Sequence, residues 1–420
     1  MSSVEVWLDD ASLGPATVIG GLTRDRSKTG DTVRFDYAAA WLSPRNPVPA
    51  FALDHDLPLA AGAHYSPFGA DHLTGIFVDC SPDRWGKMLM ERREVIQARA
   101  QERKARILRG WDFLLGVNDE SRMGALRLRD PERDAYMDSH WLTAPPITDL
   151  RTLEHAAHKV ERGANTVGDD ADMAKWILQL IAPGASLGGA RPKASFRDTD
   201  GSLWLAKFPS REDRRDVGMW EFLAYRLSLA AGIDMPPARM LALSDRGSTF
   251  AVRRFDRSGA SRRLYASAMT RLARDHSEGA SYLDLVEAIE ADGTSAGIGA
   301  QLEQLFRRVL FNVVIGNRDD HLRNHGFLRE GNGWVLSPAF DVNPNPDKHE
   351  HVLTLDGSDA SPDSGLLMAT RDFYRLTRAR AEQIEQEIRG VIRGWKALAR
   401  QLGIRNTEIQ LMGGVIDPDR

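Results

Sequence analysis

Hydrophobic and polar positions follow two different periods along this 420-residue chain. In the first roughly 130 residues, short runs of alternating apolar and polar positions predict strands, most clearly at 3–8, 32–36 and 123–128. A charged stretch at 81–108 has helical spacing instead, and its Arg, Lys and Glu side chains are typical of a solvated helix face. The amino-terminal part is therefore predicted to be rich in β-structure.

Helical spacing dominates the rest of the chain. Residues 216–231 and 302–315 are apolar at helical spacing, and 371–402 predicts a pair of helices with charged outer faces. A linking helix is expected at 149–163, and the tail from 413 to 420 is expected to be frayed. These patterns predict an α+β fold with a β-rich amino-terminal subdomain and a helical carboxy-terminal lobe.

The strongest chemical signal is the polar loop that follows the apolar helix ending near residue 315. Asp319 is followed five positions later by Asn324, and two predicted strands joined around Gly331-Asn332-Gly333 then return the chain to Asp341. This spacing is that of a kinase catalytic loop and its metal-binding Asp. We interpret Asp319 as the catalytic base, and Asn324 and Asp341 as oxygen ligands of Mg²⁺.

Other interpretations of this loop stay open. Asp320 is an alternative base, although the spacing to Asn324 favours Asp319. The same polar residues could simply cap and solvate the loop, since Asp and Asn are common there. Metal-dependent hydrolysis by His321 and its neighbouring carboxylates is a weaker alternative.

Further upstream, a series of elements follows in the order of a nucleotide-binding lobe. It comprises a glycine-rich turn, a strand Lys, a helix Glu and a strand running into a polar link. Glycines let backbone N–H groups approach phosphate oxygens, and a Lys on an apolar strand face is costly to bury unless it is paired. The candidate nucleotide-contacting residues of this series are Gly188, Gly189, Lys193, Lys207, Glu221 and Asp256. Each of these elements has a purely structural explanation when it is taken alone; for example, the glycines could form a tight turn and the Lys could extend to solvent. The order of the elements along the chain, however, indicates nucleotide binding.

These motifs together resemble the HipA-like serine/threonine kinases of bacterial toxin–antitoxin modules. The similar segments, which lie between about residue 5 and about residue 400, are 35–42, 57–59, 77–86, 123–127, 186–193, 205–209, 252–257, 316–324 and 337–342. The resemblance implies a protein-kinase-like, two-lobed fold. Its implied parts are an amino-terminal subdomain at 1–130, a linker at 131–168, a nucleotide-binding part at 169–257, a catalytic lobe at 258–412 and a tail at 413–420.

The resemblance also implies an activity and partners, and it adds Phe255 and His321 to the residues expected to contact the nucleotide. The implied activity is transfer of the γ-phosphate of ATP, with Mg²⁺, to a hydroxyl of a cytosolic protein, which could be a translation component. Ser186 matches the family's autophosphorylated serine, and a phosphate there would add about −1.5 to −2 charge beside the ATP phosphates. A small helix-turn-helix antitoxin of the HipB type is the implied partner, and DNA contact would come through it.

Composition agrees with this interpretation and limits the alternatives. The net charge of −4 gives no global basic character of the kind that nucleic-acid binding favours. The single cysteine, Cys80, excludes an internal disulfide and fits a reducing cytosol. No signal pattern or membrane-length apolar run is found, so a cytoplasmic protein without a membrane partner is expected. A small-molecule phosphotransferase and a catalytically silent kinase-fold binding protein remain the alternative functions.

Overall fold

The computed structural model describes residues 2–26, 30–67, 72–137, 144–162, 180, 189–294 and 297–419. The chain forms two compact units, the first made of Met1–Arg211 with Arg253–Ala266 and the second of Glu212–Val252 with Ser267–Arg420. Neither unit is one continuous stretch of chain, because the chain passes between them three times. The subdomain boundaries expected from the sequence remain predictions.

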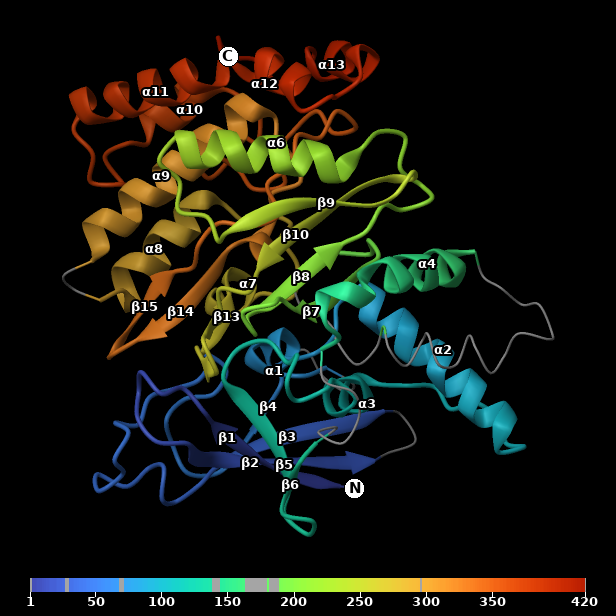
Figure 1. Ribbon diagram of the computed structural model, residues 1–420. Helices are drawn as coiled ribbons and strands as arrows, with labels where there is room; N and C mark the ends of the chain where they lie inside the picture. The colour runs from blue at the N-terminus through green and yellow to red at the C-terminus, as the bar shows by residue number, and fades with distance from the viewer. Residues whose placement is uncertain are drawn as a thin grey trace. The chain divides into compact units, whose positions relative to one another are not determined.

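The first unit is built around a six-stranded antiparallel sheet (Figure 1). Its strands, in spatial order, are β4 (Ala63–Tyr65), β3 (Asp31–Tyr37), β2 (Thr17–Arg26), β1 (Ser3–Leu8), β5 (Leu126–Asp130) and β6 (Ala135–Tyr136). Residues alternate between buried and partly exposed along β1 and β3, as a sheet with one covered face requires. The strands predicted at 3–8 and 32–36 are confirmed, whereas β5 starts three residues later than predicted, beyond Gly124 with its positive φ of 78°.

The other elements of this unit follow the sheet strands or lie between them. Among the described residues they are α1 (Gly75–Asp79), α2 (Arg84–Ala100), α3 (Gly110–Leu115), a 3₁₀ turn (Ile147–Asp149), α4 (Leu150–Glu161), the hairpin β7 (Lys193–Arg197) and β8 (Leu203–Lys207), and the short pair β11 (Arg257–Ser258) and β12 (Ser261–Arg262). Asp83 starts α2 as its N-cap, accepting a hydrogen bond from the Gly86 amide at 2.8 Å. The helix predicted at 81–108 is thus shorter, and the one predicted at 149–163 is confirmed as α4.

The second unit is mostly helical. Its helices are α6 (Val217–Ala230), α7 (Ala268–Arg271), α8 (Tyr282–Asp292), α9 (Ile298–Ile315), α10 (Ser364–Ala369), α11 (Arg378–Ile392), α12 (Trp395–Gln401) and α13 (Asn406–Met412). It also contains two hairpins, β9 (Ala238–Ser244) with β10 (Gly247–Arg253) and β14 (Gly326–Glu330) with β15 (Gly333–Leu336), and a 3₁₀ turn at Leu322–Asn324. Strand β13 (Tyr265–Ser267) lies where the chain passes between units. The predicted helices at 216–231, 302–315 and 371–402 are confirmed as α6, α9 and the pair α11 and α12.

Helix α9 is the core of this unit and packs against α8, α10 and α11 (Figure 1). It ends at Gly316, whose backbone is left-handed with φ of 75°. A Cβ at this position would lie 2.2 Å from Cγ1 of Val415 and 2.9 Å from the Val415 carbonyl oxygen, so only glycine fits. The loop that carries Asp319 therefore begins at a sharply defined point.

The expectation that the carboxy-terminal tail is frayed is wrong for the residues next to α13. Val415 and Ile416 are 4% and 2% exposed, and the Asp417 amide donates to the Val314 carbonyl at 3.1 Å. Two apolar residues are enough to hold this segment against the end of α9, because burial removes them from water.

None of the described helices combines the length and the apolar character that a bilayer span requires.

Candidate functional site

The loop after α9 is held to the helix by a side-chain and a backbone contact of Asn317. Its amide nitrogen donates to the Asn312 carbonyl at 2.9 Å, and its side-chain Nδ2 donates to Oδ1 of Asn312 at 3.1 Å. Arg318 then reaches forward, donating from Nη1 to the Lys348 carbonyl at 2.6 Å. These contacts pin the loop before the two candidate carboxylates, Asp319 and Asp320.

Asp320 is a buried hydrogen-bond acceptor. Its Oδ2 accepts from the Tyr282 hydroxyl at 2.8 Å and from Nδ2 of Asn312 at 2.7 Å, and it lies 2.8 Å from Nε2 of His325. Burial alone would raise the pKa of Asp320, but His325 and these hydrogen bonds outweigh it and lower the pKa. Asp320 is therefore an ionised structural carboxylate that joins α8, α9 and His325, the residue before β14.

Asp319, by contrast, faces solvent. Its side chain is 52% exposed, and Oδ1 forms an ion pair with Nζ of Lys348 at 2.5 Å. Lys348 is itself 41% exposed. Ion pairs between exposed groups contribute only about 0–1 kcal/mol, so this carboxylate can exchange the ammonium for another partner at little cost.

Asn324 contacts the backbone of Asp319. Its Nδ2 donates to the Asp319 carbonyl at 3.2 Å, and its amide nitrogen donates to the His321 carbonyl at 2.8 Å. Within the described part of the chain, the side-chain oxygen of Asn324 accepts no hydrogen bond, and Nδ1 of His321 is buried without a partner. The loop thus presents one amide oxygen and one imidazole nitrogen whose bonding capacity the described residues leave unused.

The hairpin predicted after this loop is confirmed. Strands β14 and β15 pair from Phe327 with Leu336 to Glu330 with Gly333, and Gly331 takes the positive φ of 54° that the tight turn needs. Beyond β15, Asp341 also has a positive φ, 58°, a left-handed backbone that few non-glycine residues adopt. Strained backbone of this kind gathers at functional sites, which marks Asp341 as a candidate.

The donor set of this loop fits a magnesium ion better than a transition metal. Within the ranges described, no group of three or more His, Cys, Asp or Glu side chains is arranged to hold a metal. Magnesium usually takes only one or two protein oxygens and completes its shell with waters and substrate phosphates. One carboxylate, Asp341, and one amide oxygen, Asn324, are of that type.

In the first unit, the structure gives Lys193 two partners. Its side chain is 1% exposed, and Nζ donates to Oδ2 of Asp83 at 2.6 Å and to the Gly189 carbonyl at 2.8 Å. The Lys193 carbonyl in turn accepts from Nε1 of Trp85 at 3.0 Å. Lys193 therefore fastens the described end of the glycine-rich turn to the start of α2, and its predicted phosphate contact stays a prediction that would need this ion pair to open.

Lys207 lies directly opposite Lys193 in the β7–β8 register, so both side chains lie on one face of the hairpin. Lys207 is 6% exposed. Opposed like charges destabilise a sheet, and the ion pair of Lys193 with Asp83 offsets this. Glu221, which belongs to the second unit, is buried in α6 at 4% exposure.

Asp256 is completely buried in the first unit. Its carboxylate accepts from Arg254 at 2.6 Å, from Arg257 at 2.5 Å and from the Gly124 amide at 2.8 Å. Burial would raise the pKa of Asp256, but the two guanidinium groups outweigh it and hold the pKa well below its usual range. Its predicted contact with a nucleotide stays a prediction, while Phe255 beside it is half-buried, with its ring centroid 5.9 Å from that of Tyr265.

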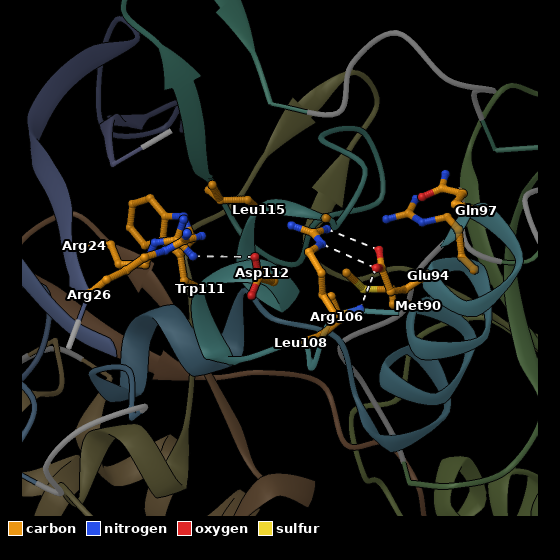
Figure 2. A pocket seen from close by; sticks show the side chains of 12 residues that line it. Arg24, Arg26, Met90, Glu94, Gln97, Arg106, Leu108, Trp111, Asp112 and Leu115 are labelled. Atoms are coloured by element: carbon orange, nitrogen blue, oxygen red, sulfur yellow. Dashed lines mark hydrogen bonds and ion pairs between the residues drawn. The ribbon is translucent and has the colours of Figure 1, made fainter. Parts of the chain in front are cut away.

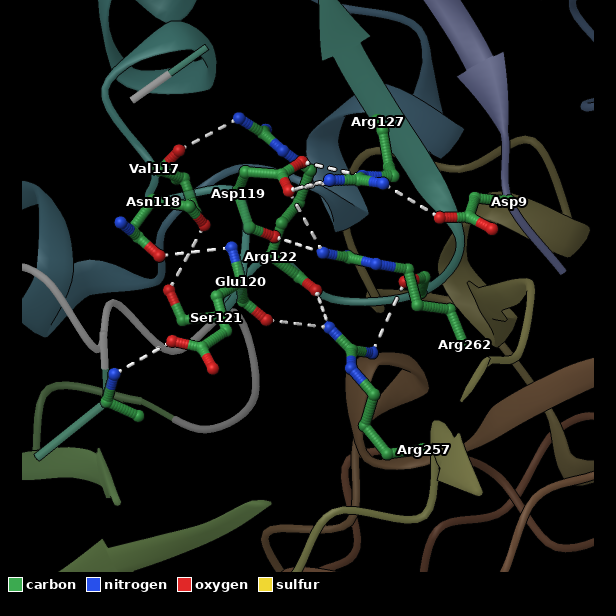
Figure 3. Close-up of polar contacts among 12 residues, drawn as sticks. Asp9, Val117, Asn118, Asp119, Glu120, Ser121, Arg122, Arg127, Arg257 and Arg262 are labelled. Atoms are coloured by element: carbon green, nitrogen blue, oxygen red, sulfur yellow. Dashed lines mark hydrogen bonds and ion pairs between the residues drawn. The ribbon is translucent and has the colours of Figure 1, made fainter. Parts of the chain in front are cut away.

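A wider arginine network holds this segment to the amino-terminal sheet region (Figure 3). Arg257 donates to the carbonyls of Glu120 and Arg122 at 3.0 and 2.7 Å. Arg262 donates to the Asp119 carbonyl at 2.6 Å, and the Asp119 carboxylate also pairs with Arg127 at 2.5 Å. Residues 253–266 therefore belong structurally with the first 130 residues, from which they are distant in sequence.

Two of the sequence-predicted residues, Gly188 and Ser186, lie outside the described residues. Gly189 lies at the edge of the described chain, where its carbonyl accepts from Lys193.

Sequence reasoning missed two charged residues that contact the candidates. Asp83 binds Lys193 from 110 positions away, and Lys348 binds Asp319 from 29 positions away. The N-cap position of Asp83 was a readable local signal, since Ser-Pro-Asp precedes a helical pattern. Nothing local marks Lys348, because an exposed loop lysine has no distinctive pattern.

The structure as a whole resembles a solved one. It superposes on HipA of Shewanella oneidensis MR-1, solved as a toxin–antitoxin complex with HipB and its operator DNA, with a TM-score of 0.66 at 16% identity over 98% of this chain and 95% of that chain. At that identity the likeness shows the fold alone. The predicted α+β fold, β-rich at the amino terminus and helical at the carboxy terminus, is thereby confirmed as HipA-like.

The sequence comparisons define the family. Residues 185–402 match the family model described as the HipA-like C-terminal domain, and because this is more than half of the chain, the protein belongs to the HipA-like family. A Sinorhizobium fredii (strain NBRC 101917 / NGR234) protein named "Putative kinase Y4mE" is 25% identical over 428 residues, covering 96% of this chain and 86% of that protein. A second from the same strain, "Putative kinase Y4dM", is 26% identical over 156 residues, 34% of this chain and 37% of that protein.

Proposed function

We propose that the protein is a serine/threonine protein kinase that uses ATP and Mg²⁺, with Asp319 as its catalytic base. The observation that supports this most is the contrast between adjacent carboxylates, Asp320 buried with three partners and Asp319 half exposed. A base must reach the hydroxyl from which it takes a proton. Asp319 alone of the two can do so without dismantling the loop.

In this proposal the residues of the loop divide the work. Asp319 orients the acceptor hydroxyl and takes its proton as the hydroxyl oxygen attacks the γ-phosphate. Lys348 leaves the carboxylate when the hydroxyl arrives, and its ammonium remains close by. Asn324 and Asp341 would hold Mg²⁺, which neutralises charge on the phosphates when bound. Nδ1 of His321, which has no hydrogen-bond partner among the described residues, could form a hydrogen bond with a phosphate oxygen.

The nucleotide contacts proposed for the first unit are those expected from the sequence. Lys207 would pair with ATP phosphates, with Glu221 as its proposed partner from the second unit. The Gly188–Gly189 turn, braced by Lys193, would approach the phosphates, and Phe255 with Asp256 would border the base or ribose. Autophosphorylation is proposed at Ser186.

The partners are proposed from the family. The likeness to HipA, whose complex contains HipB and operator DNA, supports a HipB-like helix-turn-helix antitoxin, with DNA reached through it. We propose a cytoplasmic protein substrate, for which a translation component is one option.

The test is phosphate transfer from γ-labelled ATP with magnesium, by the full chain alone and with a cytosolic extract. Asp319→Asn should keep its fold and nucleotide binding but lose transfer by about 10²-fold or more. Asp372→Asn is the matched control, since Asp372 is exposed by 76% and lies outside the loop. Transfer that survives Asp319→Asn would remove Asp319 as the base.

The same assay separates the alternative functions. Label on Ser186 and on an extract protein supports the protein kinase, and a Ser186→Ala variant with the wild-type mass gain would exclude that serine. ATP binding without protein labelling would point to a small-molecule acceptor or to a silent kinase fold. Asp341→Ala should weaken magnesium-dependent nucleotide binding itself.

A further inference from the structure

The first unit contains a cavity of about 310 Å³ between the end of β2, helix α2 and helix α3. Figure 2 shows Arg24, Arg26 and Trp111 on one side of it, and Glu94, Gln97 and Arg106 on the other. None of the residues that line it has a role in the reaction proposed above. The cavity therefore needs an explanation of its own.

Positive charge is in excess around this cavity. Four arginines line it, against two carboxylates: Arg24, Arg26, Arg93, Arg106, Glu94 and Asp112. The carboxylates are already neutralised by arginines. Glu94 pairs with Arg103 at 2.5 Å and with Arg106 at 3.3 Å, contacts that lower its pKa to about 2, and Asp112 lies 3.6 Å from Arg24.

Two guanidinium groups remain without a counter-charge. Within the described chain, the guanidinium groups of Arg26 and Arg93 make no hydrogen bond and no ion pair. Arg26 is exposed at the end of β2, whereas Arg93 is half-buried on α2. Two unpaired guanidiniums that line the same hollow favour an anion there, because each presents a planar set of donors suited to phosphate or carboxylate.

Gly116 keeps room for the Arg93 guanidinium. Its φ of −84° would suit any residue, so backbone freedom is not the reason for a glycine here. A Cβ at this position would lie 2.2 Å from Cε of Met90 and 3.2 Å from Nη2 of Arg93. A side chain at 116 would push against these two side chains of α2.

Apart from Gln97 and Gly116, the remaining lining is apolar and includes a flat ring. Trp111 is 2% exposed, and the Arg24 guanidinium lies 5.3 Å from its ring centroid. Met90, Leu108 and Leu115 lie along the same hollow. A ligand with both an anionic end and an apolar body would satisfy both parts of this lining.

We propose that this cavity binds a small organic anion, a phosphate or carboxylate attached to a flat apolar group. The anionic end would be held by Arg93 and Arg26, and the flat group would lie against the half-buried Leu108 and Leu115. A volume near 300 Å³ is at the lower limit for small-molecule sites, so the ligand carries about one ring. This site is independent of the proposed kinase reaction.

The test measures binding by titration calorimetry on the full-length protein, with phenyl phosphate as the probe. Inorganic phosphate lacks the ring and phenol lacks the charge, so both should bind at least about tenfold more weakly. Arg93→Gln should weaken phenyl phosphate about tenfold or more, since one charge-assisted hydrogen-bonding group is lost. Arg26→Gln tests the second guanidinium in the same way.

Arg99→Gln is the matched control, because Arg99 is exposed on the same helix, carries the same charge and does not line the cavity. Its affinity for phenyl phosphate should equal that of the wild type. Absent binding to the wild type, equal affinities of wild type and Arg93→Gln, or an equal loss in Arg99→Gln would each overturn the proposal. Inorganic phosphate binding as tightly as phenyl phosphate would overturn the role of the flat group.

Discussion

The contrast between the adjacent carboxylates Asp319 and Asp320 leads to a sharp prediction about stability. All three contacts of Asp320 end on Oδ2, so an asparagine could place its amide oxygen there and keep their geometry. What Asp320→Asn removes is the charge. Hydrogen bonds to a charged group contribute about 1.5–3 kcal/mol and neutral ones about 1, so three of them should lose about 3 kcal/mol in total.

Asp319→Asn is the matched comparison. Asp319 is 52% exposed and has one ion pair, with Lys348, so its loss should change the free energy of unfolding by less than about 1 kcal/mol. Urea unfolding followed by tryptophan fluorescence measures both changes. Amide hydrogen exchange over 312–325 shows whether the loss originates at this loop.

The pH dependence provides an internal check. The folded protein lowers the pKa of Asp320 below its ordinary value of 3.8. Its stabilisation is therefore present above that value and is lost as the pH falls toward the lowered pKa. The difference between wild type and Asp320→Asn should accordingly shrink below about pH 4. A loss under about 1 kcal/mol at pH 7, or an equal loss in Asp319→Asn, would refute the structural role of Asp320.

Three further changes test the packing and charges of the two units. Asp83→Asn should lower the free energy of unfolding by about 3–5 kcal/mol in urea titrations, because it leaves the Lys193 ammonium buried without its counter-charge. Adding Lys193→Met to this variant should restore part of the lost stability. Burial raises the pKa of Asp54 from 3.8 to about 6. The stabilisation that protonated Asp54 provides is therefore full below the unfolded pKa and is lost as the pH rises through about 6. Between pH 4 and pH 7 the free energy of unfolding should fall by up to about 3 kcal/mol, and this fall should be absent in Asp54→Asn. Ile416→Ala should lower the free energy of unfolding by about 2–4 kcal/mol in thermal or urea unfolding. Leu411→Ala, at a side chain that is 52% exposed, should lower it little. Equal effects of the two changes would mean that the tail is frayed after all.

Much of the local structure could be predicted from the pattern of the chain. The alternation at 3–8, the helical spacing at 302–315 and the hairpin turn around Gly331-Asn332-Gly333 each appear in the structure where expected. These signals depend on residues a few positions apart in the sequence. The spacing of apolar residues over such short distances determines whether a helix or a strand can place them on one buried face. The spacing of Asp319 and Asn324 is local in the same sense.

Where local signals failed, the deciding partner was distant in the chain. The tail looked frayed because its apolar residues are few, yet Val415 and Ile416 are buried, and a side chain at Gly316 would collide with Val415. Lys193 looked like a phosphate ligand in a basic, glycine-rich segment, and only the structure shows Asp83 at its ammonium. The sequence of a short apolar or charged segment does not specify which distant residue it will contact in the folded protein.

The sequence by itself determined several helices and strands, their order and the residue types of the loop from Asn317 to Asn324. Only the tertiary structure decided which of two adjacent carboxylates is buried and which is open to solvent, and that unpaired arginines and Trp111 line one cavity. The physical reason is that propensity and periodicity act between near neighbours, whereas burial, desolvation and charge pairing depend on what the folded chain brings close from far away.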